Sequence, residues 1–240
     1  FFLSDLVVDG EIPEDINAFK AQQFRWAKGS IQTAIKLLPS IFRSRHSCLA
    51  KIEATFHLTY YGIYPLMLCV ALLAWPFYSL SNLHFGTPLF ILLSNILGFT
   101  ALAPTLVCAV SQNLLHPRGW RRIRYFPMLL SLGIGIAVTN SRAVLEALLR
   151  IPSEFVRTPK KGSRIMRRYP ARLSFGAVLE LVLGAYCFVT LFVLMDAHKY
   201  LALPYLFINA AGFTAVGLMS VFHFIGKLQW SVPLATPASE

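Results

Sequence analysis

The stretch LSFGAVLELVLGAYCFVTLFVLM, residues 173–195, decides the class of fold. Glu180 is its one charged residue, and the rest is apolar over a length that lets a helix cross a bilayer. Three further runs of this kind lie at 56–80, 88–115 and 201–225. The four runs predict four transmembrane helices in an all-α membrane protein.

The composition agrees with this interpretation. Of the 240 residues, 56% are hydrophobic and 14% are charged, and the mean hydropathy is +0.58. A soluble domain of this size needs more polar surface. The net charge of +11 comes from Lys and Arg in short blocks between uncharged runs, a pattern typical of the cytoplasmic side of membrane proteins. Nucleic-acid binding would need a basic face on a soluble domain, so we expect no nucleic-acid partner.

A fifth apolar run, YFPMLLSLGIGIAVT at residues 125–139, is predicted not to cross. Basic blocks lie on both sides of it, at 118–124 and 150–172. If the run crossed, one of these blocks would have to be translocated, against the positive-inside bias of short loops. An interfacial or re-entrant segment keeps both blocks on one side. Asn140 and Arg142 follow directly, so we expect the run to end near water.

An amphipathic helix precedes the first span. The sequence IPED at 12–15 is a helix-start signal, which predicts a helix from about 14 to 38 that Pro39 stops. Its second half is too short and too charged to span and suits the headgroup plane. An amphipathic helix on a soluble core would show the same pattern. The predicted apolar stripe consists of Ile31, Ile35, Leu38 and Phe42.

A polar and aromatic cluster lies in this helix. Gln22, Arg25 and Trp26 are spaced i, i+3 and i+4, so they share one face, with Gln23 beside them. An indole offers a flat plate and one N–H donor to a sugar ring, a guanidinium fits phosphate oxygens, and an amide can exchange hydrogen bonds with hydroxyls. The alternative is an interfacial tryptophan beside a snorkelling arginine.

Two motifs carry a resemblance. QQFRW at 22–26 resembles the Q(Q/R)xRW motif of processive family 2 glycosyltransferases, the cellulose synthase-like group. FVRTPKKG at 155–162 resembles the FxVTxKG gating loop of that family, with Arg157 where cellulose synthases carry Val. The motifs occur in the family's order, and with the predicted spans the resemblance covers nearly the whole chain.

The resemblance implies roles for these residues. Trp26 would stack on the acceptor sugar at the mouth of a translocation channel, with Gln22, Gln23 and Arg25 around it. The gating loop would close over the bound nucleotide sugar, as mobile lids do. Arg157 would add a phosphate contact or meet lipid headgroups. The residues assigned to the gate and the diphosphate are Phe155, Arg157, Thr158 and Lys160.

The chemistry that the family also needs is missing from the chain. No Asp-x-Asp for the nucleotide's Mg²⁺ or Mn²⁺ is present, and no acid stands in a TED-type motif that would supply the base. We therefore assign no catalytic residue and no metal ligand here, and expect both upstream of Phe1. The chain is interpreted as the C-terminal fragment of a GT-A-type membrane glycosyltransferase.

The expected organisation follows from these assignments. An end of the cytosolic domain (1–30) leads to the interface helix (31–48), two transmembrane helices (49–115), the interfacial segment (116–149), the gating loop (150–172), two more transmembrane helices (173–226) and a cytosolic tail (227–240).

The whole enzyme is expected in the cytoplasmic membrane, in contact with lipid. It would transfer hexosyl units from a UDP- or GDP-hexose to a growing polysaccharide and move the product across the bilayer. One alternative is a non-processive family 2 transferase that acts on a lipid. Another is a small transporter or channel, which would need functional polar residues inside the spans. The candidates for that role, with no obvious pairing in the sequence, are His57, Asn95, Glu180 and Asn209.

Overall fold

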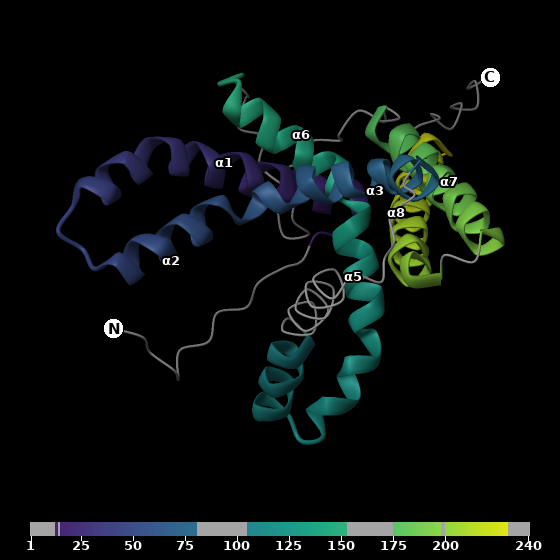
Figure 1. Ribbon diagram of the computed structural model, residues 1–240, viewed down its shortest axis with the longest axis horizontal. Coiled ribbons are helices and arrows are strands. Elements are labelled where there is room, and N and C mark those ends of the chain that lie inside the picture. The colour runs from purple at the N-terminus through teal and green to yellow at the C-terminus, as the bar shows by residue number, and fades with distance from the viewer. Residues whose placement is uncertain (1–12, 14, 81–104, 153–174, 198–199, 230–240) are drawn as a thin grey trace, which may run out of the picture.

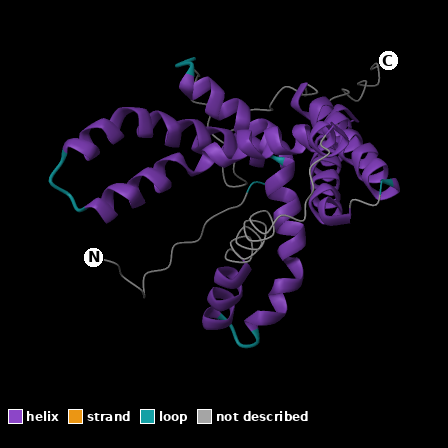
Figure 2. Ribbon diagram, in the orientation of Figure 1, coloured by secondary structure: helices purple, strands orange, loops and turns teal. Residues whose placement is uncertain are grey.

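The computed structural model describes residues 13, 15–80, 105–152, 175–197 and 200–229, and everything below refers to these. Helices make up 91% of them, and they contain no strand (Figure 2). The longer helices are α1 (Ile16–Arg43), α2 (Cys48–Thr59), α3 (Ile63–Leu80), the helix Thr105–Leu115, α5 (Phe126–Gly135), α6 (Ala137–Leu148), α7 (Phe175–Asp196) and α8 (Leu203–Gln229). Short 3₁₀ turns are η1 (Tyr60–Gly62), η2 (Gly119–Tyr125) and η3 (Tyr200–Ala202).

Three helical segments are long and apolar enough to cross a membrane: Cys48–Pro76, Phe175–Asp196 and Leu203–Gly226. A fourth candidate is the pair Gly119–Gly135 and Ala137–Leu148, which is bent by 43°. The all-helical fold and these apolar helices indicate a membrane protein. Much of the predicted span 88–115 lies outside the described residues, and its described part is the helix Thr105–Leu115.

The predicted start of α1 is confirmed, but its predicted end is wrong. Asp15 is the N-cap, and its carboxylate accepts a hydrogen bond from the Ala18 amide at 2.7 Å. Pro39 lies inside the helix and does not end it. A proline removes one backbone hydrogen-bond donor, but the next turn of the helix still forms here. The helix ends at Arg43, where the amide and hydroxyl of Ser44 both donate to the Ile41 carbonyl.

The second half of α1 pairs with α2 in an antiparallel hairpin (Figure 1). Ser30 donates to the Leu58 carbonyl at 2.9 Å, and Lys51 donates to the Phe42 carbonyl at 3.0 Å. The residues of the predicted apolar stripe differ in burial. Ile31 is buried, whereas Phe42 is 53% exposed. The sequence did not predict α2 as a separate helix beginning at Cys48.

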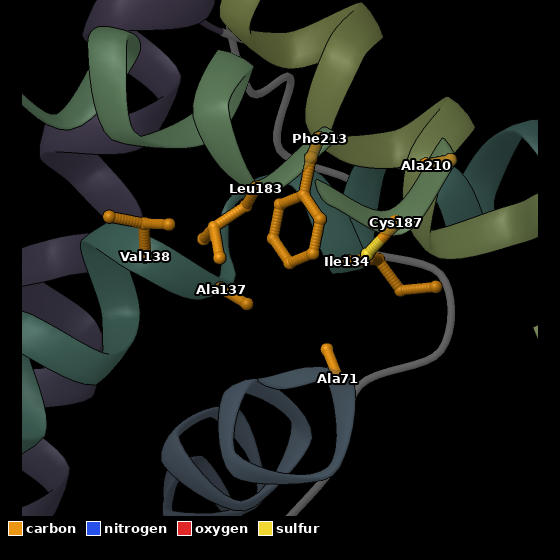
Figure 3. Packing of buried hydrophobic residues seen from close by; sticks show 8 residues of the cluster. All are labelled: Ala71, Ile134, Ala137, Val138, Leu183, Cys187, Ala210 and Phe213. Atoms are coloured by element: carbon orange, nitrogen blue, oxygen red, sulfur yellow. The ribbon is translucent and has the colours of Figure 1, made fainter. Parts of the chain in front are cut away.

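The bundle of α5, α7 and α8 packs through small residues. A Cβ at Gly184 of α7 would collide with Thr214 of α8, and a Cβ at Gly212 would lie 2.5 Å from the Ser131 carbonyl oxygen of α5. Close approach at small residues is characteristic of membrane helices. Figure 3 shows the resulting core, in which the ring of Phe213 lies near Leu183.

The fifth apolar run forms α5 and the start of α6, with the bend at Ile136 between them. Arg142, expected near water, has a side chain that is 73% exposed. Asn140 was also expected near water, and that prediction is wrong, because Asn140 is fully buried. The helix continues to Leu148, so Asn140 faces its neighbours within the protein instead of ending the segment.

Candidate functional site

The predicted acceptor cluster lies on α1, whose two faces differ sharply. The inner face packs against α6, α8 and η1, and two of its buried residues are lysines. The buried residues of the helix are Ile16, Lys20, Ala27, Lys28, Ile31 and Ala34. Gln22 and Trp26 are one turn apart on the opposite face, and Trp26 is 53% exposed.

Lys20 joins the start of α1 to both of the last helices. Its Nζ lies 2.6 Å from one carboxylate oxygen of Glu180 in α7 and 2.8 Å from the other, and it donates to the Ser220 hydroxyl of α8 at 3.2 Å. Asn17 donates to the Ser220 carbonyl at 3.4 Å. The side chains of Lys20 and Glu180 are 7% and 0% exposed. Such a buried pair is tolerated because each charge has a partner, and it fixes which surfaces meet.

Lys28 makes the second link, to α6. Its Nζ donates to Glu146 at 2.8 Å, and Arg142 donates to the other oxygen of the same carboxylate at 2.8 Å. The Lys28 ammonium and the Arg142 guanidinium lie 5.8 and 5.7 Å from the centroid of the Phe24 ring, within the range of cation–π contacts. The middle of α1 is thus held by charge and by aromatic contact.

Small side chains bring α1 and α6 close together between these links. Ala27 and Ile31 pack with Ala143 and Ala147 of α6 and with Tyr61 of η1. Alanines let the two backbones approach, as small residues do in membrane helix pairs. Packing on one side and ion pairs at two levels leave the position and rotation of α1 well determined.

The predicted site residues lie on this fixed helix. Gln22, Gln23 and Arg25 are half-buried, and Trp26 is the most exposed of the four. The helix carries Gln22, Arg25 and Trp26 on neighbouring turns, as their spacing predicted, with Gln23 beside them. The predicted gate residues Phe155, Arg157, Thr158 and Lys160 lie outside the described residues.

The sequence did not identify the functional partners of the lysines. Glu180 was interpreted as a span residue without an obvious partner, but it pairs with Lys20. The partners are 160 residues apart, so no helical spacing could reveal them. The signal that was available was a single acid in an apolar span, because such an acid usually has a partner.

Other buried polar groups lie in the bundle. Within the described part of the chain, the buried Ser141 hydroxyl has no hydrogen-bond partner. Asn209 donates to the Tyr205 carbonyl at 2.8 Å. No group of three or more His, Cys, Asp or Glu side chains in the described ranges could hold a metal ion.

Comparison of the chain with models of protein families, with curated proteins and with solved structures found no match.

Proposed function

We propose that the chain is the acceptor-binding and channel-forming membrane part of a processive family 2 β-glycosyltransferase. The intact enzyme would extend a polysaccharide from a UDP- or GDP-hexose and move it across the cytoplasmic membrane. The observation that carries the proposal is the position of QQFRW: it lies on a helix fixed on one side, with Trp26 exposed on the other.

A fixed helix suits an acceptor platform. The end of a growing glycan must be held in one place while the next sugar is added, and a misplaced acceptor slows the reaction steeply. The Lys20–Glu180 and Lys28–Glu146 pairs hold α1 against α7 and α6, so the indole of Trp26 is presented from a rigid element. Gln22 lies one turn before it and supplies amide donors and acceptors for sugar hydroxyls.

The proposal leaves the group-transfer chemistry to residues outside this chain. The Asp-x-Asp that holds the Mg²⁺ or Mn²⁺ and the carboxylate that deprotonates the acceptor hydroxyl belong to a preceding catalytic domain. Within the chain, Thr158 and Lys160 contact the diphosphate when the gate closes.

The topology that fits this function keeps the gate in the cytosol. In it, α5 and α6 form a bent, non-crossing segment, and the basic blocks at 118–124 and 150–172 stay on the cytoplasmic side. The bend of 43° at Ile136 occurs in broken spans as well as in re-entrant segments, so this topology rests on the distribution of the basic blocks.

The test replaces Trp26 in the full-length enzyme. Trp26→Ala should reduce polymer synthesis by roughly five- to 150-fold, since stacking of a ring on an aromatic side chain is worth about 1–3 kcal/mol. Binding of the nucleotide sugar should be unchanged, because stacking acts on the acceptor. Trp26→Phe should retain part of the activity.

The matched control is Phe42→Ala, since Phe42 lies on the same helix and has the same exposed fraction of 53%. It should leave synthesis unchanged. Equal losses of donor binding and synthesis in Trp26→Ala would assign Trp26 a structural role. A product of one added sugar from the wild type would favour the non-processive alternative.

A further inference from the structure

The structure contains a second cationic region that the proposed function does not use. It is the tip of the helical hairpin formed by Thr105–Leu115, η2 and α5, and we name residues 116–125 the arginine turn. In Figure 1 this tip lies at the lower end of α5, away from α1 and α7. Four exposed arginines project from it: Arg118, Arg121, Arg122 and Arg124.

Within the described residues, no ion pair joins these arginines to an acid. The chain contains no Asp or Glu between Glu53 and Glu146, so none lies near the turn in the sequence. In the described part of the chain, no carboxylate pairs with any of the four. Arg122 donates to the neutral Gln112 side chain at 3.0 Å, and Arg124 donates to the Tyr125 hydroxyl at 2.8 Å. Their charge is therefore available to an anionic ligand.

The turn is built to present these groups. Gly119 is buried, and a Cβ there would collide with the backbone of Gln112, so the chain folds back tightly at this point. Arg118 adopts a left-handed conformation with φ of 60° to make the turn. Hydrogen bonds from the Gly119 amide to His116 and from the Arg121 amide to Arg118, at 3.0 and 3.1 Å, close it.

Aromatic rings accompany the charges. Arg121 lies over the Trp120 ring at 5.9 Å from its centroid, and Arg124 lies over the Tyr125 ring at 4.8 Å. Trp120 and Tyr125 are 60% and 54% exposed. Tryptophan and tyrosine favour the membrane–water interface, where the ring meets apolar material and its polar edge meets water.

The helices that flank the turn expose apolar side chains. Leu114 and Leu115 are 81% and 67% exposed on one side, and Met128 and Leu129 are 73% and 58% exposed on the other. A ligand for the whole surface must therefore offer negative charge at the tip and hydrocarbon along both arms. An acidic protein or a nucleic acid would leave the arms in water.

We propose that the arginine turn binds the headgroups of anionic phospholipids, with its flanking helices in the acyl region of the same leaflet. The planar guanidinium of an arginine can donate two parallel hydrogen bonds to the oxygens of a lipid phosphate. Trp120 and Tyr125 set the depth of the turn. This inference is independent of the proposed glycosyltransferase function.

The first test uses the wild-type, full-length protein. It is reconstituted in phosphatidylcholine vesicles that contain a minority of phosphatidylglycerol with a photoreactive headgroup. After irradiation, cross-linked peptides are identified by mass spectrometry. Cross-links should concentrate in residues 116–125. Cross-links that spread evenly over all basic segments, or that leave 116–125 unlabelled, would overturn the proposal.

The second test removes charge. Arg121→Gln, Arg122→Gln and Arg124→Gln together should weaken binding of phosphatidylglycerol on the order of a hundredfold, since each cation near an anionic surface contributes roughly fivefold. The matched control removes the same charge from the α1–α2 end through Lys36→Gln, Arg43→Gln and Arg45→Gln, all at exposed positions. It should keep the binding. An equal loss in both variants would mean general attraction and would overturn the proposal.

Two further arms keep the result interpretable. The combined variant Arg121→Lys, Arg122→Lys and Arg124→Lys retains the charge and should retain most of the binding, so a loss there would contradict headgroup attraction. Inorganic phosphate, compared with chloride at equal ionic strength, should not displace phosphatidylglycerol. Displacement would make the turn a site for free phosphate instead of a lipid site.

Discussion

The inner face of α1 and the arginine turn are both cationic, but their charges are used in opposite ways. Lys20 and Lys28 are buried and pair with Glu180 and Glu146 at 2.6 and 2.8 Å. The arginines of the turn are exposed, and the described part of the chain offers them no carboxylate. One region uses cations to join helices, and the other presents them to the surroundings.

This difference teaches that a basic residue in a membrane protein has to be interpreted together with the acids near it in space. The chain has 22 Lys and Arg residues and 11 Asp and Glu residues. Two of these acids lie against α1, where they form buried ion pairs with its lysines and so join α1 to other helices. The positive-inside pattern alone cannot separate the two uses.

The largest expected effect comes from the Lys20–Glu180 pair. Glu180→Gln removes one charge with little change of volume and leaves Lys20 buried without a counter-ion. We expect a loss of about 3–5 kcal/mol in the free energy of unfolding, because an uncompensated buried charge is costly. Denaturant unfolding of the purified full-length protein in neutral detergent measures it.

The double variant Lys20→Met with Glu180→Gln is the control for this pair. It removes both charges and should recover most of the lost stability. If the single variant is as stable as the wild type, the two side chains do not form a buried pair. The inner face of α1 would then not differ from the arginine turn in how its charges are used.

A smaller effect is expected at Glu146. Glu146→Gln leaves Lys28 without its counter-charge, but the Glu146 side chain is 15% exposed, so water compensates in part. We expect a loss of roughly 1–3 kcal/mol in unfolding free energy. Glu53→Gln is the matched control at an exposed position and should change nothing measurable. Similar losses in both variants would point to net charge as the cause.

The smallest effect is expected in the arginine turn. The triple variant Arg121→Gln, Arg122→Gln and Arg124→Gln should change the unfolding free energy in neutral detergent by less than about 0.5 kcal/mol, as for other surface substitutions. The same unfolding assay gives the answer. A large destabilisation would show that these arginines hold the fold, and the distinction between joining and presenting charges would be lost.

Periodicity and caps predicted much of the fold. Asp15 begins α1 close to the expected position, and α7 and α8 match the apolar runs at 173–195 and 201–225. These features depend on neighbours within a few residues. Pro39 was expected to end α1, but its local effect on the backbone was too weak to do so.

The site was predicted less completely than the fold. The spacing of Gln22, Arg25 and Trp26 predicted a shared helix, and α1 provides it. The contacts that fix this helix join it to Glu146 and Glu180, which are 118 and 160 residues away from their lysines. Such pairs depend on tertiary packing, and the helical periodicity of a sequence carries no information about tertiary packing.

The link between α1 and the last two helices also sets an order of assembly. Lys20 meets Glu180 and Ser220, which follow it by 160 and 200 residues. At a synthesis rate of about 5–20 residues per second, these partners appear roughly 8 to 40 s after Lys20. A chain that stops at residue 152 should therefore leave the Lys20 amine reactive towards a water-soluble reagent, and the complete chain should protect it. During synthesis α1 lies beside an unfinished bundle, and α7 and α8, which are made later, fix its position.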